Sequence, residues 1–171
     1  WSGLSGAFLL DDFPNLAVID RLPEDATSSD FIYLARSGIA GILGRPISML
    51  SFLLQHSAWP DPYYFTLSNL VIHLINGDLI ALCCLLISKC WDLPPIKPLT
   101  LLLISLLWLL HPIQASTVFY VVQRMTLLSS TFILLGLLGY LAGRYQLGKA
   151  KLRSGSILMM TSPLVAAVLG F

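Results

Sequence analysis

The sequence predicts an all-α integral membrane protein, a polytopic bundle of transmembrane helices. Hydrophobic residues make up 56% of the 171 residues and charged residues only 11%, whereas a soluble domain carries about 25% charge. The mean hydropathy is +0.80, and several apolar stretches approach the roughly 20 residues that a helix needs to cross a bilayer. The net charge of +1 lacks the basic footprint of a nucleic-acid-binding protein. We therefore expect membrane lipids as partners and no nucleic acid.

The first part of the chain is predicted to leave the membrane early. It begins at Trp1 without a methionine and stops within an apolar run, which indicates a fragment of a longer polytopic protein. Residues 1–10 are expected to be the end of a first transmembrane helix. Residues 11–62 follow as an extracytoplasmic loop, and its first part, up to Asp30, holds six of the nine acidic residues. Short interfacial helices are predicted within this loop at 31–43 and 47–55.

The remainder, residues 63–171, is predicted to hold about four membrane spans, the last of them incomplete. The stretch 99–110 is almost purely Leu, Ile and Trp but short for a bilayer, so we expect it to continue through Pro112 or to begin in the preceding turn. A short interfacial helix is expected between the second and third spans, and a polar connector before the fourth. The predicted elements are spans at 63–90, 99–110, 125–143 and 157–171, the interfacial helix at 115–122 and the connector at 144–156.

The distribution of basic residues predicts the orientation. The connector at 144–156 carries four Lys and Arg residues and no acid, which assigns it to the cytoplasm by the positive-inside rule. Alternating sides back along the chain gives a cytoplasmic turn at 91–98. The segment 111–124 and the loop at 11–62 are then both outside. Two polar clusters are thus expected on one face of the membrane.

These two clusters contain candidate chemistry. Asp11 and Asp12 are adjacent carboxylates at the end of an apolar run, where they are expected at the membrane–water boundary. With Arg45, His111 and Arg124 they suit a substrate that carries a phosphate and a hydroxyl nucleophile. A carboxylate can take the hydroxyl proton, and arginine contacts phosphate bidentately. In the simpler alternative, the two acids are a solvated helix end, and the arginines pair with acids at the membrane edge.

A second polar pattern lies inside the span at 63–90. Asn69, His73 and Asn76 share one helix face, within about 60° of each other. Polar side chains in a span usually face a neighbouring helix, so inter-helix hydrogen bonding is favoured over direct catalysis. Gln114 is counted with them as a supporting polar residue. Asp78 points away from this face and receives no role.

The three cysteines are predicted to be packing residues. They lie within or at the end of the same apolar span, with no carboxylate or histidine at ligand spacing nearby. Neither a disulfide nor a metal cluster is indicated for them. They are Cys83, Cys84 and Cys90.

The order of the polar motifs resembles a known family. Along the chain they are Asp11-Asp12, Arg45-Pro46, the Asn69/His73/Asn76 face, His111-Pro112, and Arg124 followed by Leu127-Leu128-Ser129. This order, over most of residues 9–143, looks like the GT-C superfamily of membrane glycosyltransferases. The resemblance is to the transmembrane O-mannosyltransferase-like proteins that often carry tetratricopeptide repeats, and to bacterial pilin glycosyltransferases.

The resemblance implies a GT-C-like helical bundle with the acidic pair in its first outer loop. The donor would be a polyprenyl- or dolichyl-phosphate-linked sugar and the acceptor a hydroxyl of protein Ser/Thr or of a glycan. Asp11 matches the position of the base, although Asp12 could serve, or the pair could help bind a divalent cation such as Mg²⁺ or Mn²⁺. Arg45, His111 and Arg124 would meet the donor phosphate.

The implied location is the bacterial inner membrane with the site facing the periplasm, or the endoplasmic reticulum with the site facing the lumen. Gln114 stands where related sequences often have an acid or His, and Gln123 where Gly is frequent. These departures leave the sugar and the acceptor open.

Two further functions remain open. A transporter or lipid-binding scaffold would use Asp78 and the Asn69/His73/Asn76 face as a pathway and would show an aqueous path near the midplane. A polysaccharide ligase or polymerase would share the lipid-linked donor class. A glycosyltransferase instead predicts an outer cavity that converges on Asp11 and Arg124.

Overall fold

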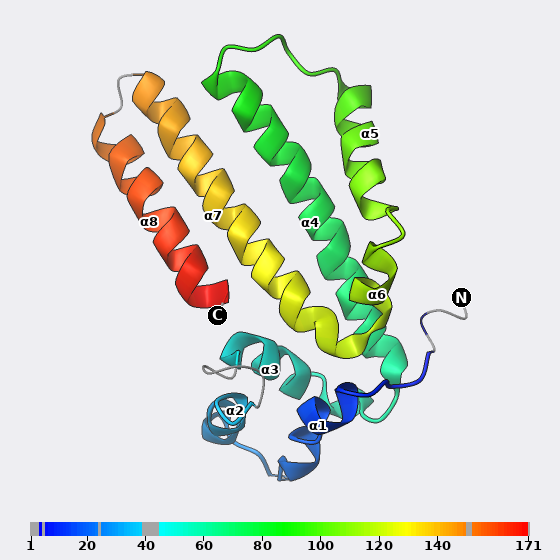
Figure 1. Ribbon diagram of the computed structural model, residues 1–171. Coiled ribbons are helices and arrows are strands. Elements are labelled where there is room, and N and C mark those ends of the chain that lie inside the picture. Colours follow the sequence, from blue (N-terminus) through cyan, green and yellow to red (C-terminus); the bar gives the residue numbers. More distant parts are fainter. Residues whose placement is uncertain (1–3, 5, 24, 39–44, 150–151, 171) are drawn as a thin grey trace. The chain divides into compact units, whose positions relative to one another are not determined.

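The computed structural model describes residues 4, 6–23, 25–38, 45–149 and 152–170, and its regular secondary structure there is helical. No strand occurs among these residues. Three helical segments are long and apolar enough to cross a membrane (Figure 1): α4 (Pro62–Cys90), the continuous stretch Val121–Gly148, and α8 (Leu152–Gly170). The all-α class is thus confirmed for the described residues, and three of the four expected spans have sufficient length.

The fourth expected span is a shorter helix. α5 (Pro98–Leu109) has 12 residues, about 18 Å of helix, against a hydrocarbon core of about 30 Å. It starts at Pro98, whose fixed φ suits a first helical position. It ends before Pro112, because a residue that precedes proline is disfavoured in helical conformation. The expected continuation through Pro112 was therefore wrong, and the alternative start in the preceding turn holds only for Pro98.

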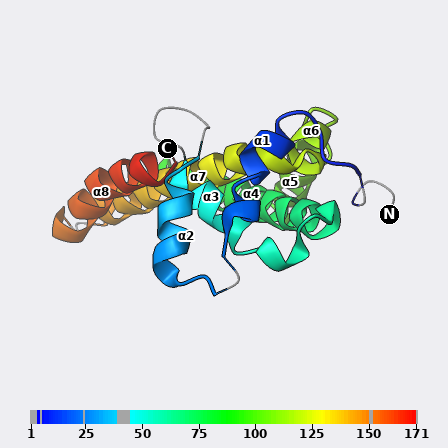
Figure 2. The same ribbon diagram turned by 90° about the horizontal axis from the view of Figure 1, so that it is seen from below.

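The chain divides into two compact units, residues 1–71, 115–128 and 171, and residues 72–114 and 129–170. The first unit surrounds a hydrophobic core that includes Leu16, Phe52, Phe65 and Met125. Figure 2 shows its short helices grouped together. They are α1 (Asp12–Leu16), η1 (Ile19–Arg21), α2 (Ser28–Ala35), α3 (Pro46–Leu53), η2 (His56–Ala58), most of α6 (Gln114–Phe119) and η3 (Val121–Gln123), with the first turns of α4 and of α7 (Arg124–Gly148).

Several boundaries in the first unit differ from the predicted ones. Residues 6–9 have no regular structure, so the helix end expected at 1–10 is wrong for the described residues. α2 begins at Ser28, ahead of the predicted 31–43, because Thr27 and Asp30 form a capping box that satisfies the first backbone N–H groups. Residues 39–43 of that prediction lie outside the described residues. The interfacial helices predicted at 47–55 and 115–122 correspond to α3 and to α6 with η3.

The second unit contains the apolar parts of α4 and α7 with α5 and α8. In Figure 1, α4 lies between α5 and α7, and α7 runs alongside α8. The polar connector predicted at 144–156 is mostly helical, because α7 continues to Gly148 and α8 starts at Leu152. A helix of 25 residues is about 37 Å long, so its last polar turn can extend beyond the hydrocarbon core.

Candidate functional site

The two adjacent acids have different environments. The Asp12 side chain is 1% exposed. Its Oδ2 atom accepts the N–H of Leu9 at 2.8 Å and its Oδ1 atom accepts the N–H of Val122 at 2.7 Å. Burial raises the pKa of this carboxyl group, against the opposing effect of the two backbone N–H groups. Asp12 is thus an anchor that ties the N-terminal turn to a segment 110 residues away.

Asp11 presents its carboxylate outward. Its side chain is exposed, while its backbone is held on both sides. Its N–H donates to the hydroxyl of Tyr120 at 3.0 Å, and its carbonyl accepts the Nδ2 of Asn15 at 2.8 Å. Of the two acids predicted to be catalytic, Asp11 is therefore the one open to a substrate. Both oxygens of Asp12 are already used by the protein backbone.

Arg124, predicted to bind the donor phosphate, is 1% exposed and surrounded by protein. Its Nε donates to Asn69 Oδ1 at 3.0 Å, Nη1 to the Ser51 carbonyl at 3.1 Å and Nη2 to the Phe65 carbonyl at 2.9 Å. The guanidinium carbon lies 4.6 Å from the centroid of the Phe52 ring. Three of its five N–H groups donate to protein acceptors, and its burial keeps a substrate phosphate from reaching it in this geometry. The hydrogen-bond partners of Arg124 among the described residues are an amide and two backbone carbonyls and include no acid.

Asn69 completes this arrangement. Its Nδ2 atom lies 3.2–3.3 Å from the carbonyl oxygens of Val118, Tyr120 and Val121. Asn69 therefore satisfies backbone acceptors just before α7 and at the same time orients Arg124. A polar face within an apolar span, of which Asn69 is part, was the sequence signal for this role. No signal identified Tyr120, Ser51 or Phe65 as the partners.

His73 and Asn76 have the corresponding roles in the second unit. The Nε2 atom of His73 lies 3.0 Å from the Leu109 carbonyl, and its ring stacks on Trp108 with centroids 4.8 Å apart. Asn76 Oδ1 accepts the hydroxyl of Thr131 at 2.7 Å. The favoured prediction, hydrogen bonding between helices, is therefore confirmed for this polar face.

The other predicted site residues lie nearer the surface. Arg45, in the first unit, is half-buried and precedes α3 in a left-handed conformation with φ of 48°. His111 is exposed in the second unit, and its Nδ1 atom accepts the N–H of Ile113 at 3.3 Å. Gln114 begins α6, and its N–H donates to the carbonyl of His111 at 2.9 Å.

An apolar pocket adjoins His111. Its volume is about 290 Å³. Three leucines of α5 and the leucine that follows it form most of the lining, together with one imidazole. Such a lining suits an aliphatic chain with a polar group at one end. The lining residues are Leu103, Leu106, Leu107, Leu110, His111 and Pro112.

Two of the three cysteines contact α7, in agreement with the predicted packing role. Cys83 is buried with its Sγ 3.8 Å from the Leu134 carbonyl, and the Sγ of Cys90 lies 3.3 Å from the Leu141 carbonyl. Within the described part of the chain, no group of three or more His, Cys, Asp or Glu side chains has a metal-binding arrangement. The divalent cation suggested for the acidic pair stays a prediction.

Comparison with known proteins adds no relative: no family model, no curated protein and no solved structure matches this chain. Functional assignment therefore depends on the chemistry of its own side chains.

Proposed function

We propose that the protein is an integral-membrane glycosyltransferase of the GT-C type. It transfers a sugar from a polyprenyl-phosphate-linked donor to an acceptor hydroxyl of protein Ser/Thr or of a glycan. The observation that carries the proposal is the contrast within the acidic pair. Buried Asp12 anchors the turn through two backbone N–H groups, and Asp11 exposes its carboxylate from a fixed backbone.

In the proposed reaction, Asp11 is the general base. Its carboxylate takes the proton of the acceptor hydroxyl while that oxygen forms a bond to the anomeric carbon. The bond between this carbon and the phosphate oxygen breaks, and its electron pair leaves with the lipid phosphate. A base whose backbone is held by Tyr120 and Asn15 needs little reorientation before proton transfer, which favours catalysis.

The donor is proposed to bind at the pocket beside α5. Its leucine walls are compatible with a polyprenyl chain, and the exposed imidazole of His111 with a phosphate. The role of Arg45, in the first unit, toward the donor phosphate stays a prediction, and Arg124 is left out because it is buried and bonded to protein acceptors. The expectation that His111 and Arg45 lie on the extracytoplasmic side is based on the positive-inside rule. That side would be the periplasm in a bacterium or the lumen of the endoplasmic reticulum in a eukaryote.

The decisive variant is Asp11→Asn, which removes the proposed base and keeps the shape of the side chain. Membranes that contain the protein are supplied with polyprenyl-phosphate-linked radiolabelled sugars, and transfer to protein or glycan is counted. Loss of a general base lowers the rate by about 10²–10⁴-fold, so transfer should fall at least 100-fold. The matched control is Asp25→Asn, another exposed acid of the same unit, which should transfer normally.

Thermal unfolding is measured on both variants, because the role requires that Asp11→Asn folds as well as the wild type. Normal transfer by a folded Asp11→Asn protein would remove Asp11 as the base. His111→Ala tests the donor pocket separately and should raise the KM for the lipid-linked sugar more than it lowers kcat.

The transporter alternative needs an aqueous path that reaches Asp78 and His73 near the midplane. His73 is buried and hydrogen-bonded to the Leu109 carbonyl, which does not favour such a path, whereas Asp78 is exposed. Cysteine accessibility at these positions measures any aqueous path directly.

A further inference from the structure

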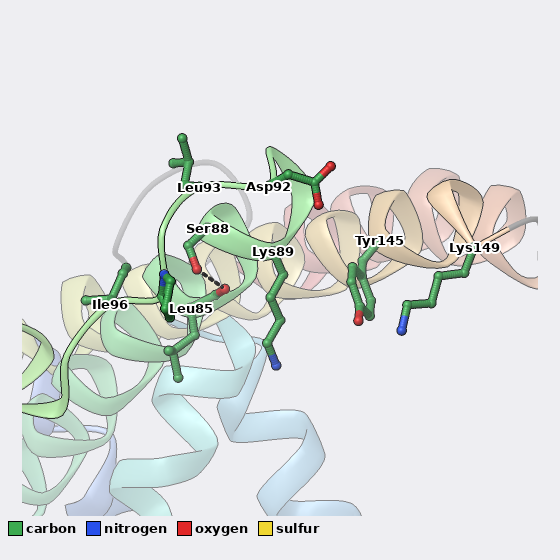
Figure 3. Close-up of a pocket in the computed structure, with 9 residues that line it drawn as sticks. Leu85, Ser88, Lys89, Asp92, Leu93, Ile96, Tyr145 and Lys149 are labelled. Atoms are coloured by element: carbon green, nitrogen blue, oxygen red, sulfur yellow. Dashed lines mark hydrogen bonds between the residues drawn. The ribbon is translucent and has the colours of Figure 1, made fainter.

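A second pocket lies at the other end of the spans, where α4 and α7 end. Its volume is about 450 Å³ (Figure 3). Two lysines, a serine and a tyrosine supply polar groups, and leucine, isoleucine and proline supply apolar walls. The lining residues are Leu85, Ser88, Lys89, Asp92, Leu93, Pro95, Ile96, Tyr145 and Lys149.

The cations of this pocket face one side. In Figure 3 the side chains of Lys89, Tyr145 and Lys149 extend to the same side of the ribbon. Asp92 is the one acid among the lining residues. Among the described residues neither lysine is in an ion pair. Both ammonium groups therefore remain available to an anion.

Aromatic rings hold two cations at this end of the spans. The Lys149 Nζ lies 4.6 Å from the centroid of the Tyr145 ring, and the Arg144 guanidinium carbon 4.6 Å from that of Trp91. A cation over an aromatic face is attracted by the ring quadrupole and is restricted in position. Binding of an anion here loses less side-chain entropy than binding by freely mobile lysines.

The backbone forms the remaining wall by a specific turn. The N–H of Leu93 donates to the Ser88 carbonyl at 2.9 Å, and Asp92 has φ of 48°. This hydrogen bond spans six residues and closes a Schellman motif. Asp92, the residue before the donor, has the left-handed conformation that the motif requires. Leu93 and Lys89 both line the pocket, which therefore combines apolar surface with a cation.

Charge is strongly segregated at this end. The segments 89–98 and 144–153 contain six of the ten Lys and Arg residues of the chain and one of its nine acids. By the positive-inside rule this end faces the cytoplasmic leaflet, whose anionic lipids attract basic residues near the membrane surface.

We propose that this pocket binds the phosphate head group of an anionic phospholipid from the adjacent leaflet. Lys89 and Lys149 contact the phosphate oxygens. The apolar wall made by Leu85, Leu93 and Ile96 contacts the glycerol and upper acyl region. This amphipathic lining favours a lipid over free phosphate. The site is independent of the proposed sugar transfer.

The test compares two double variants of equal charge in the intact protein. Lys89→Gln/Lys149→Gln removes the pocket cations, whereas Lys97→Gln/Arg153→Gln removes two basic residues of the same end that do not line the pocket. Each protein is reconstituted in nanodiscs of phosphatidylcholine doped with phosphatidylglycerol, and retained phosphatidylglycerol is counted by native mass spectrometry. The pocket variant should lose at least about tenfold in affinity, and the control variant less than about threefold.

Three further measurements make the result decisive. Lys89→Arg/Lys149→Arg keeps the charge and should restore binding. Protease protection of the 144–153 end checks that topology is unchanged. Equal losses of phosphatidylglycerol affinity in both Gln variants, or no loss in either, would overturn the proposal that this pocket is the binding site. Displacement of phosphatidylglycerol from the wild type by millimolar inorganic phosphate would overturn the lipid as its occupant.

Discussion

The Nε atom of Arg124 donates to the Oδ1 atom of Asn69 across 3.0 Å in the interior of the first unit. Asn69 also donates to the carbonyls that immediately precede Arg124, and the guanidinium donates to carbonyls of α3 and α4. These two side chains therefore brace the start of α7 against two other helices. The segment that they brace also holds Val122, the partner of Asp12, and Tyr120, the partner of Asp11.

Arg124→Lys is expected to lower the free energy of unfolding by about 3 kcal/mol, because a single ammonium cannot replace a three-way fork and leaves buried acceptors unpaired. Thermal unfolding in detergent measures this loss. Arg36→Lys, at an exposed arginine, is the matched control and should be neutral. An Arg124→Lys protein that is as stable as the wild type but has lost sugar transfer would show that Arg124 acts on the substrate.

Asp12→Asn is expected to lower the free energy of unfolding by about 1–3 kcal/mol. Both oxygens of Asp12 accept backbone N–H groups, and the amide NH₂ of asparagine would point a donor at one of them. Asp11→Asn should leave stability unchanged, because the Asp11 carboxylate is exposed. Unfolding of the two variants side by side tests whether the adjacent acids have separate roles, and equal losses would contradict it.

The raised pKa of Asp12 predicts a direction for pH dependence. Burial makes protonation of this group easier in the folded protein than in the unfolded chain. Its contribution to stability is therefore fully present below the ordinary pKa of 3.8 and is lost as pH rises through the raised value. The stability difference between wild type and Asp12→Asn should shrink over that window. A difference that grows with pH would show that the two backbone N–H groups outweigh burial.

The contribution of Asp30 to stability should depend on pH in the opposite direction. The Thr27 hydroxyl, and then the Thr27 backbone N–H, lower the pKa of Asp30. This contribution is present above the ordinary pKa of 3.8 and is lost as pH falls through the lowered value. Thr27→Val removes the hydroxyl, so NMR titration of Asp30 should give a pKa closer to the ordinary value. An unchanged pKa would assign the shift to the backbone alone.

Gly143→Ala should separate α7 from α8. A Cβ at Gly143 would lie 2.7 Å from the Gly155 carbonyl oxygen and 2.8 Å from the Met159 backbone nitrogen, and backbone atoms cannot move aside as a side chain can. Small residues allow such close helix approach in membranes, and overpacking costs about 1–3 kcal/mol. Gly148→Ala is the control, because nothing lies within 4 Å of its Cβ position. Equal stability of the two variants would contradict the packing.

The long helices could be predicted because hydropathy averaged over a span does not depend on which helix packs where. The inter-helix role of the Asn69/His73/Asn76 face was also predictable, since a buried amide or imidazole in an apolar span needs a hydrogen-bond partner. The identity of those partners was not, because Thr131 and the carbonyls of Leu109 and Val121 are distant in sequence. The short length of α5 was misjudged, although Pro98 and Pro112 both pointed to it.

The sequence by itself determined the membrane character, the helical class and the segregation of basic residues to one end. These properties follow from composition and local patterning. Only the tertiary structure decided which charged side chains face the interior. Asp11 and Asp12 are chemically equal neighbours, and Arg45 and Arg124 are both arginines near polar clusters. Burial and hydrogen bonding to a segment 110 residues away separate Asp12 from Asp11. Such contacts arise from packing, which adjacent letters in a sequence do not encode.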